Sequence, residues 1–105
     1  MGYRSDVAIV FDDHHAKILE AICGYDLDLN EFVGYAIRDN DFRSLRFEGV
    51  KWYEGYPEVD KMDNFLEKID EESFHFIRLG EETEDTETKG YFESGLYINR
   101  SIEQW

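Results

Sequence analysis

The chain has 105 residues, of which 25 are acidic and 11 basic, so that its net charge is −14. This negative charge repels phosphate groups and argues against direct binding of DNA, RNA or an anionic membrane. Aromatic residues make up 16% of the chain and proline occurs once, a composition that excludes a disordered chain and predicts one compact domain spanning residues 1–105.

The sequence contains no signal for membrane insertion or secretion. No run approaches the roughly 18 apolar residues that a membrane-spanning helix needs, and the first residues lack an apolar export segment. Cys23 is the only cysteine, which excludes an internal disulfide and an all-cysteine metal site. We therefore expect a cytoplasmic protein with no cofactor.

The chain begins with a predicted strand and a helix. Val7–Phe11 is an apolar, β-branched run typical of a buried strand. Asp12 and Asp13 are suited to cap a helix after it, and Gly24 is suited to end that helix.

A second helix is predicted next. Asp28 and Glu31 have nearly the spacing of a capping box, and Leu27 and Phe32 are placed to form its hydrophobic staple. The apolar residues of this helix recur at helical spacing and comprise Leu29, Phe32, Val33, Ala36 and Ile37.

The middle of the chain predicts a hairpin and a third helix. Apolar and polar residues alternate over 45–53, and the phase changes at Gly49, where glycine allows a hairpin turn or a bulge. We expect the hairpin. Pro57 is suited to the first position of a helix whose buried face comprises Val59, Met62, Phe65, Leu66 and Ile69. The residues expected on the opposite, solvent-exposed side of this helix are Asp63, Glu67, Lys68 and Asp70.

Two strands are predicted in the last third. Phe74–Leu79 is one strand, and Tyr91–Ile98 is the other, with an irregularity at Ser94–Gly95. The residues between them, 81–89, are too polar to pack and are expected to form a loop. The whole order predicts an α+β fold, an antiparallel sheet with helices on one face, with a ferredoxin-like variant as one form of it. The helices leave the other face of the sheet uncovered, and we expect a second copy of the chain to bind there, which would give a homodimer.

The negative charge is concentrated in one part of the chain. Residues 54–93 contain fourteen acidic and four basic residues, a net charge of −10. Asp70 and Glu71 are expected at the C-terminus of the third helix. Acidic side chains are unfavourable there, because this end of the helix dipole is negative. Two interpretations stay open: a solvated face that keeps the protein soluble, or carboxylates that take the place of phosphates in a partner's basic groove. The candidate partner-binding residues are Glu58, Asp63, Glu67, Asp70, Glu71, Glu81, Glu82, Glu84, Asp85 and Glu87. Candidate aromatic anchors beside them are Trp52, Tyr53, Tyr56 and Tyr91.

The sequence offers little for catalysis. The run Asp12–His15 contains the Asp-His-His triplet that names a family of phosphoesterases, and such side chains can bind Mn or Zn. No further aspartate or histidine motif completes a two-metal site, and helix capping explains the aspartates. We expect neither an enzyme nor a bound metal, and a metal-dependent phosphoesterase is the least favoured alternative.

Three segments resemble small acidic proteins encoded by bacteriophages and prophages. They are Gly2–Val7, Val50–Val59 and Phe76–Glu82. The resemblance implies a phage origin and residence in the cytoplasm of a bacterial host, and it implies no mechanism.

Charge and resemblance together predict a phage anti-defence protein. We expect it to inhibit a host nucleic-acid-binding protein with a basic groove, such as a CRISPR complex or a defence nuclease, through a DNA-mimic-like surface. An immunity or antitoxin-like inhibitor of a toxic nuclease is one alternative. A phage interaction protein without mimicry is another.

Overall fold

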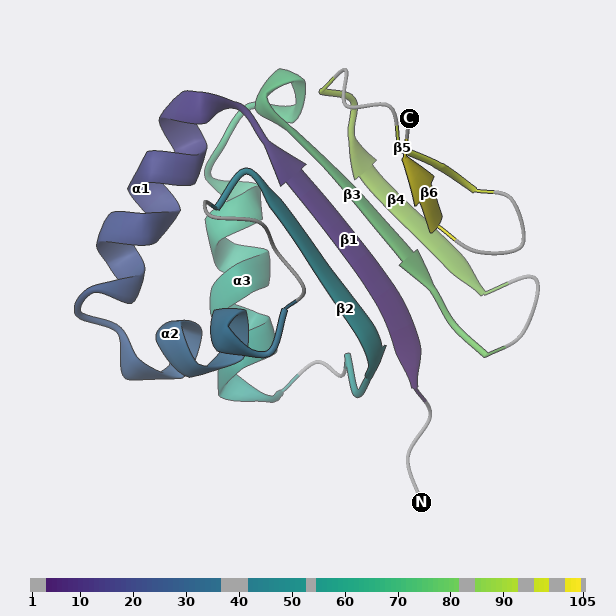
Figure 1. The fold of residues 1–105 in the computed structure, drawn as a ribbon, viewed down its shortest axis with the longest axis horizontal. Coiled ribbons are helices and arrows are strands. Elements are labelled where there is room, and N and C mark those ends of the chain that lie inside the picture. Colours follow the sequence, from purple (N-terminus) through teal and green to yellow (C-terminus); the bar gives the residue numbers. More distant parts are fainter. Residues whose placement is uncertain are drawn as a thin grey trace.

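The computed structural model describes residues 4–36, 42–52, 55–81, 85–92, 96–98 and 102–104. These residues form a four-stranded antiparallel sheet with helices packed on one face (Figure 1). The elements are β1 (Ser5–Phe11), α1 (Asp13–Cys23), α2 (Leu27–Gly34), β2 (Ser44–Val50), α3 (Pro57–Glu67), the 3-10 helix η1 (Glu71–Ser73), β3 (Phe74–Leu79), β4 (Thr86–Gly90), β5 (Leu96–Ile98) and β6 (Ile102–Gln104). The predicted α+β class is confirmed.

The strands of the main sheet lie in the order β2-β1-β3-β4. Because β2 and β3 are both antiparallel to β1, they run parallel to each other with β1 between them. Helix α3 joins them, which makes β2-α3-β3 a split β-α-β unit. A ferredoxin-like fold contains such units in the order β-α-β-β-α-β, whereas here two helices follow β1 and only one strand, β2, lies between α2 and α3. The ferredoxin-like variant is therefore not the observed topology.

The main core lies between the sheet and the three helices. Val7 and Ile9 of the central strand are fully buried on this side, together with Leu19 of α1 and Met62 of α3. Phe32 of α2 is stacked on Phe47 of β2, with 4.6 Å between the ring centroids.

The N-terminus of α1 agrees with the prediction, and that of α2 does not. The Asp12 carboxylate accepts a 2.8 Å hydrogen bond from the backbone N–H of His15, which confirms the expected cap. In α2 the capping residue is Asp26, whose carboxylate accepts from the N–H of Leu29. The proposed capping box at Asp28 is therefore wrong. Leu27 is 81% exposed, so it forms no hydrophobic staple.

The predicted hairpin over 45–53 is also wrong, because β2 is one strand with a bulge. Val50 pairs with Ser5 and Phe47 pairs with Val7, so β2 has one extra residue between these pairs. Gly49 adopts a φ of 62°, which favours glycine, and its N–H donates a 2.9 Å hydrogen bond to Asp6. The bulge keeps the apolar side chains on the core side after the phase change.

Helix α3 begins at Pro57 as predicted, but it ends at Glu67. Asp70 and Glu71 therefore do not close this helix: Asp70 precedes η1 and Glu71 begins it. The argument that they oppose the negative end of α3 is wrong.

The segment expected to be a polar loop contains strand β4. Residues Thr86–Gly90 pair with β3, and the turn before them is closed by a 2.7 Å hydrogen bond from the Gly80 N–H to the Asp85 carbonyl. An edge strand has one neighbour and needs no apolar residues when its inward side chains find polar partners. The predicted strand Tyr91–Ile98 is observed in part: Tyr91 and Phe92 are not in a strand, Leu96–Ile98 is strand β5, and residues 93–95, with the expected irregularity at Ser94–Gly95, lie outside the described residues.

The face of the sheet opposite the helices has its own small core. Ala8, Val10 and Ile77 are buried there, with Leu79 and Phe92 packed against them. Strand β6, paired with β5 in a separate two-stranded sheet, contacts β1, and in Figure 1 it lies on the side away from the helices. The apolar centre of this face is thus buried within one chain. The homodimer stays a prediction, but this buried apolar centre removes the open apolar face from which the dimer was inferred.

Candidate functional site

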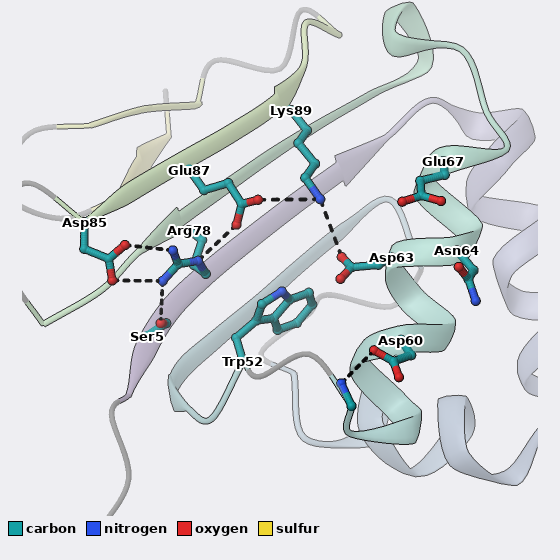
Figure 2. A pocket seen from close by; sticks show the side chains of 11 residues that line it. Ser5, Trp52, Asp60, Asp63, Asn64, Glu67, Arg78, Asp85, Glu87 and Lys89 are labelled. Carbon is teal, nitrogen blue, oxygen red and sulfur yellow. Dashed lines mark hydrogen bonds and ion pairs between the residues drawn. The ribbon is translucent and has the colours of Figure 1, made fainter.

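A groove of about 790 Å³ lies on the helix side of the sheet, between α3 and the β3–β4 hairpin (Figure 2). In Figure 1, α1, α2 and α3 lie toward β2, away from the edge strand β4. The charged residues that line it are five carboxylates and two cations, a net charge of −3: Asp60, Asp63, Glu67, Arg78, Asp85, Glu87 and Lys89. Ser5, Trp52, Gly55 and Asn64 complete the lining.

Arg78 organises the hairpin side of the groove. Its guanidinium donates to both carboxylate oxygens of Asp85, at 2.8 and 3.3 Å, and to Glu87 at 3.1 Å. It also donates to the hydroxyl of Ser5 at 3.0 Å. The side chain is only 16% exposed, and the hydrogen bonds to Asp85 raise its pKa further. The two carboxylates predicted to face a partner are therefore bound to a cation of the same chain.

Lys89 lies between the two walls of the groove (Figure 2). Its ammonium is 3.7 Å from Asp63 Oδ1 and 3.6 Å from Glu87 Oε2, distances of ion pairs rather than hydrogen bonds. The same nitrogen is 5.3 Å from the centre of the Phe76 ring, within the range of a cation–π contact.

Asp63 is the carboxylate that the prediction placed wrongly. It was expected on the solvent-exposed side of α3, but its side chain points into the groove and is 28% exposed. Its Oδ1 is buried and has no hydrogen-bond partner among the described residues. Burial raises the pKa of this carboxyl group; Lys89 opposes the shift, while Glu87 and two acids of α3 add to it.

The eight described residues among the ten candidate partner-binding residues lie in several places. Asp63, Glu67, Asp85 and Glu87 line the groove. The others are dispersed: Glu58 lines a separate hollow beside α2, Asp70 and Glu71 lie at η1, Glu81 accepts from the Arg4 N–H, and Glu82 and Glu84 lie outside the described residues.

A second acidic feature lies between α3 and β3, and we call it the η1 ridge. It comprises Glu67, Asp70, Glu71 and Glu72, all exposed. None of the four forms an ion pair with a described cation. The Tyr91 hydroxyl donates to Glu72 at 3.4 Å, and the charge of Glu72 raises the pKa of that hydroxyl. Tyr91 is 62% exposed, so an aromatic ring and several free carboxylates are presented together.

The other predicted aromatic anchors have different environments. Trp52 lines the groove, but its indole also packs against Phe32, Phe47 and Phe76 of the core. Tyr56 precedes α3 and is partly exposed; Tyr53 lies outside the described residues.

The groove cations were missed from the sequence, although a signal for them exists. Phe74, Phe76 and Arg78 alternate along β3, as Glu87 and Lys89 alternate along β4. The period of two places each set on one face of its strand. Their proximity to α3 depends on the topology, which no local pattern predicts.

The Asp12–His15 run acts as a helix start in this structure. Asp12 accepts from the backbone and Nδ1 of His15, each at 2.8 Å, while Asp13 pairs with Arg43 at 3.2 Å. Among the residues that the structure describes, no three His, Cys, Asp or Glu side chains converge as a metal site requires. Cys23, the single cysteine, is buried.

Comparisons with known proteins give no family for this chain. No protein-family model matches it, and no curated protein or solved structure is significantly similar. No helix among the described residues is long and apolar enough to span a bilayer.

Proposed function

We propose that this chain is a phage accessory protein that inhibits a host nucleic-acid-binding protein by occupying its basic surface. The observation that carries the proposal is the η1 ridge. Residues 67–72 contain four acidic residues and one basic residue, Lys68, and the four carboxylates are exposed. The groove carboxylates of the hairpin contribute less, because Arg78 already binds Asp85 and Glu87.

The chemistry of the ridge suits a surface that normally holds phosphates. Carboxylates that form no ion pair with a described cation can accept hydrogen bonds from lysine and arginine side chains of a partner. Tyr91 adds a large apolar surface with a polar tip, a typical anchor residue of protein interfaces. With a net charge of −14, association with a basic protein is electrostatically steered and weakened by salt.

The proposal is tested by capture from a bacterial lysate on the immobilised protein at low salt, followed by elution with duplex DNA. We expect nucleic-acid-binding proteins in the DNA eluate. The ridge variant Asp70→Asn/Glu71→Gln should retain less of them. The control Glu20→Gln/Glu48→Gln removes the same charge at two exposed sites elsewhere and should behave as the parent chain.

The identity of the eluted protein separates the related alternatives. A CRISPR complex or defence nuclease supports an anti-defence role, and a toxic nuclease supports an immunity role. If duplex DNA releases nothing, or if both variants capture equally, the ridge is no phosphate mimic and the proposal fails.

A further inference from the structure

The outward face of α2 exposes large apolar side chains that have no role in the core. Leu27 is 81% exposed and Tyr35, which ends the helix, is 71% exposed. With Glu31 they lie at positions i, i+4 and i+8, on one side of the helix. The Tyr35 hydroxyl is 3.5 Å from a Glu31 carboxylate oxygen, which connects the two side chains.

A hollow of about 260 Å³ adjoins this face, between α2 and the start of α3. Its lining combines the rings of Phe32 and Tyr35 with the carboxylates of Asp28, Glu31 and Glu58. Lys61 neutralises Asp28 at 2.9 Å, but neither Glu31 nor Glu58 forms an ion pair with a described cation. The lining of the hollow thus combines two aromatic residues with three acidic residues, of which Asp28 is paired with Lys61.

Gly34, the last residue of α2, is a second and independent observation. Its φ is not positive, and a Cβ built on it meets no atom within 4 Å. Glycine is a poorer helix former than alanine, and no contact with a described residue requires glycine here. It does leave the backbone bare between the positions of Leu27 and Tyr35, so that another chain can approach closely.

We propose that this surface, comprising the outward face of α2 and the adjoining hollow, binds an amphipathic basic segment of a partner protein. An aliphatic side chain of that segment fills the hollow over Phe32, and lysine or arginine side chains pair with Glu31 and Glu58. Charge selects this occupant: a second copy of a chain with a net charge of −14 would bring like charges to these carboxylates.

This inference adds a second binding surface and does not depend on phosphate mimicry by the η1 ridge. The two are tested separately, since the lysate experiment changes ridge residues and the following experiment changes residues of α2.

The probe is a synthetic 14-residue amphipathic peptide of leucine and lysine, added to the labelled protein and followed by two-dimensional NMR. We expect the largest amide shifts on α2 and the first turn of α3. A peptide with serine in place of leucine has the same charge and should bind at least about tenfold more weakly, because the hollow then stays unfilled.

Variants locate the contact. Leu27→Ser, Tyr35→Ser and Gly34→Gln should each weaken peptide binding about tenfold, the last by blocking close approach while remaining compatible with the helix. Ile18→Ser is the control, an exposed apolar side chain of α1 that lies in neither surface, and it should leave binding unchanged.

Three outcomes of the peptide experiment overturn the proposal: no amide shifts on α2, equal binding of the serine peptide, or equal weakening by Ile18→Ser. Light scattering tests the other occupant. A dimer of the parent chain that Leu27→Ser dissociates would assign this face to a second copy and likewise overturn it.

Discussion

The two sides of α3 differ in how their polar and apolar groups are partnered. On the groove side, Arg78 and Lys89 lie among carboxylates of the same chain, and the Trp52 indole rests on core aromatic rings. On the α2 side, Leu27 and Tyr35 extend into solvent beside carboxylates. The groove contains more charged residues than the α2 surface, yet contacts within the chain account for most of them.

The contrast separates structural residues from candidate binding residues. Where internal contacts account for a side chain, its substitution should reduce stability. Where they do not, substitution should leave stability unchanged or increase it, and the cost should appear in binding. Stability measurements on matched substitutions therefore test the comparison directly.

The largest effect is expected at Gly90, which ends β4. Its φ is 72°, and an added Cβ would lie 2.2 Å from the Phe74 carbonyl oxygen. We expect Gly90→Ala to lower the free energy of unfolding by about 3 kcal/mol or more, from backbone strain and steric overlap together. Urea titration measures this, and a loss below about 1 kcal/mol would contradict the described end of β4.

Arg78 should come second. Arg78→Met leaves Asp85 and Glu87 without their main cation, and we expect a loss of about 2 kcal/mol. Lys61 is the matched control on the α2 side, since it also pairs with two carboxylates but is 40% exposed. Lys61→Met should cost less than about 1 kcal/mol. Equal losses in urea titration would mean that the groove pairs are no more structural than the exposed ones.

Gly34→Ala should raise the free energy of unfolding instead of lowering it. The new methyl group meets no neighbouring atom, and alanine favours the helix, so we expect a gain of about 0.5–1 kcal/mol. Thermal unfolding, run beside Gly90→Ala, tests the pair of glycines. A destabilised Gly34→Ala would show that the chain itself requires this glycine, and the docking argument would lose that support.

The smallest effect concerns the pH dependence of Asp63. Because burial raises the pKa of this group in the folded state, the folded protein binds its proton more tightly than the unfolded chain. Its contribution to stability is present below the ordinary aspartate pKa of 3.8 and is lost as the pH rises through the raised value. Asp63→Asn should therefore be slightly more stable than the parent at pH 7, with the difference gone near pH 3. Urea titrations at both pH values measure it, and a variant less stable at pH 7 would mean that the Lys89 pair outweighs burial.

Much of the fold was accessible from local sequence patterns. The strand over Phe74–Leu79 was predicted with its observed bounds, and Pro57 marked the first residue of α3. These elements carry strong apolar patterns or residues with fixed backbone preferences. The choice of Asp26 over Asp28 as the cap of α2 could not be made, because both residues are good caps and the start of the helix decides between them.

The errors in the strands and in the acidic residues have another physical cause, which is contact between different elements of the fold. Strand β4 can be polar because Glu87 pairs with Arg78 of the neighbouring strand and Lys89 pairs with Asp63 across the groove. The bulge at Gly49 depends on the Asp6 carboxylate, far away in the sequence. For the same reason the sequence could not separate the candidate acids: Asp85 and Glu87 pair with Arg78, whereas the η1 ridge forms no ion pair with a described cation.

The position of β1 has a consequence for how the molecule is assembled. Ile9 is bonded into the sheet against Leu45 on one side and Phe76 on the other, so the earliest strand depends on two partners that follow much later. A chain growing on the ribosome exposes the apolar run Val7–Phe11 until β3 has been synthesised, a period in which its edges are open to other chains. High contact order of this kind slows folding and makes the nascent strand the part most in need of protection by chaperones.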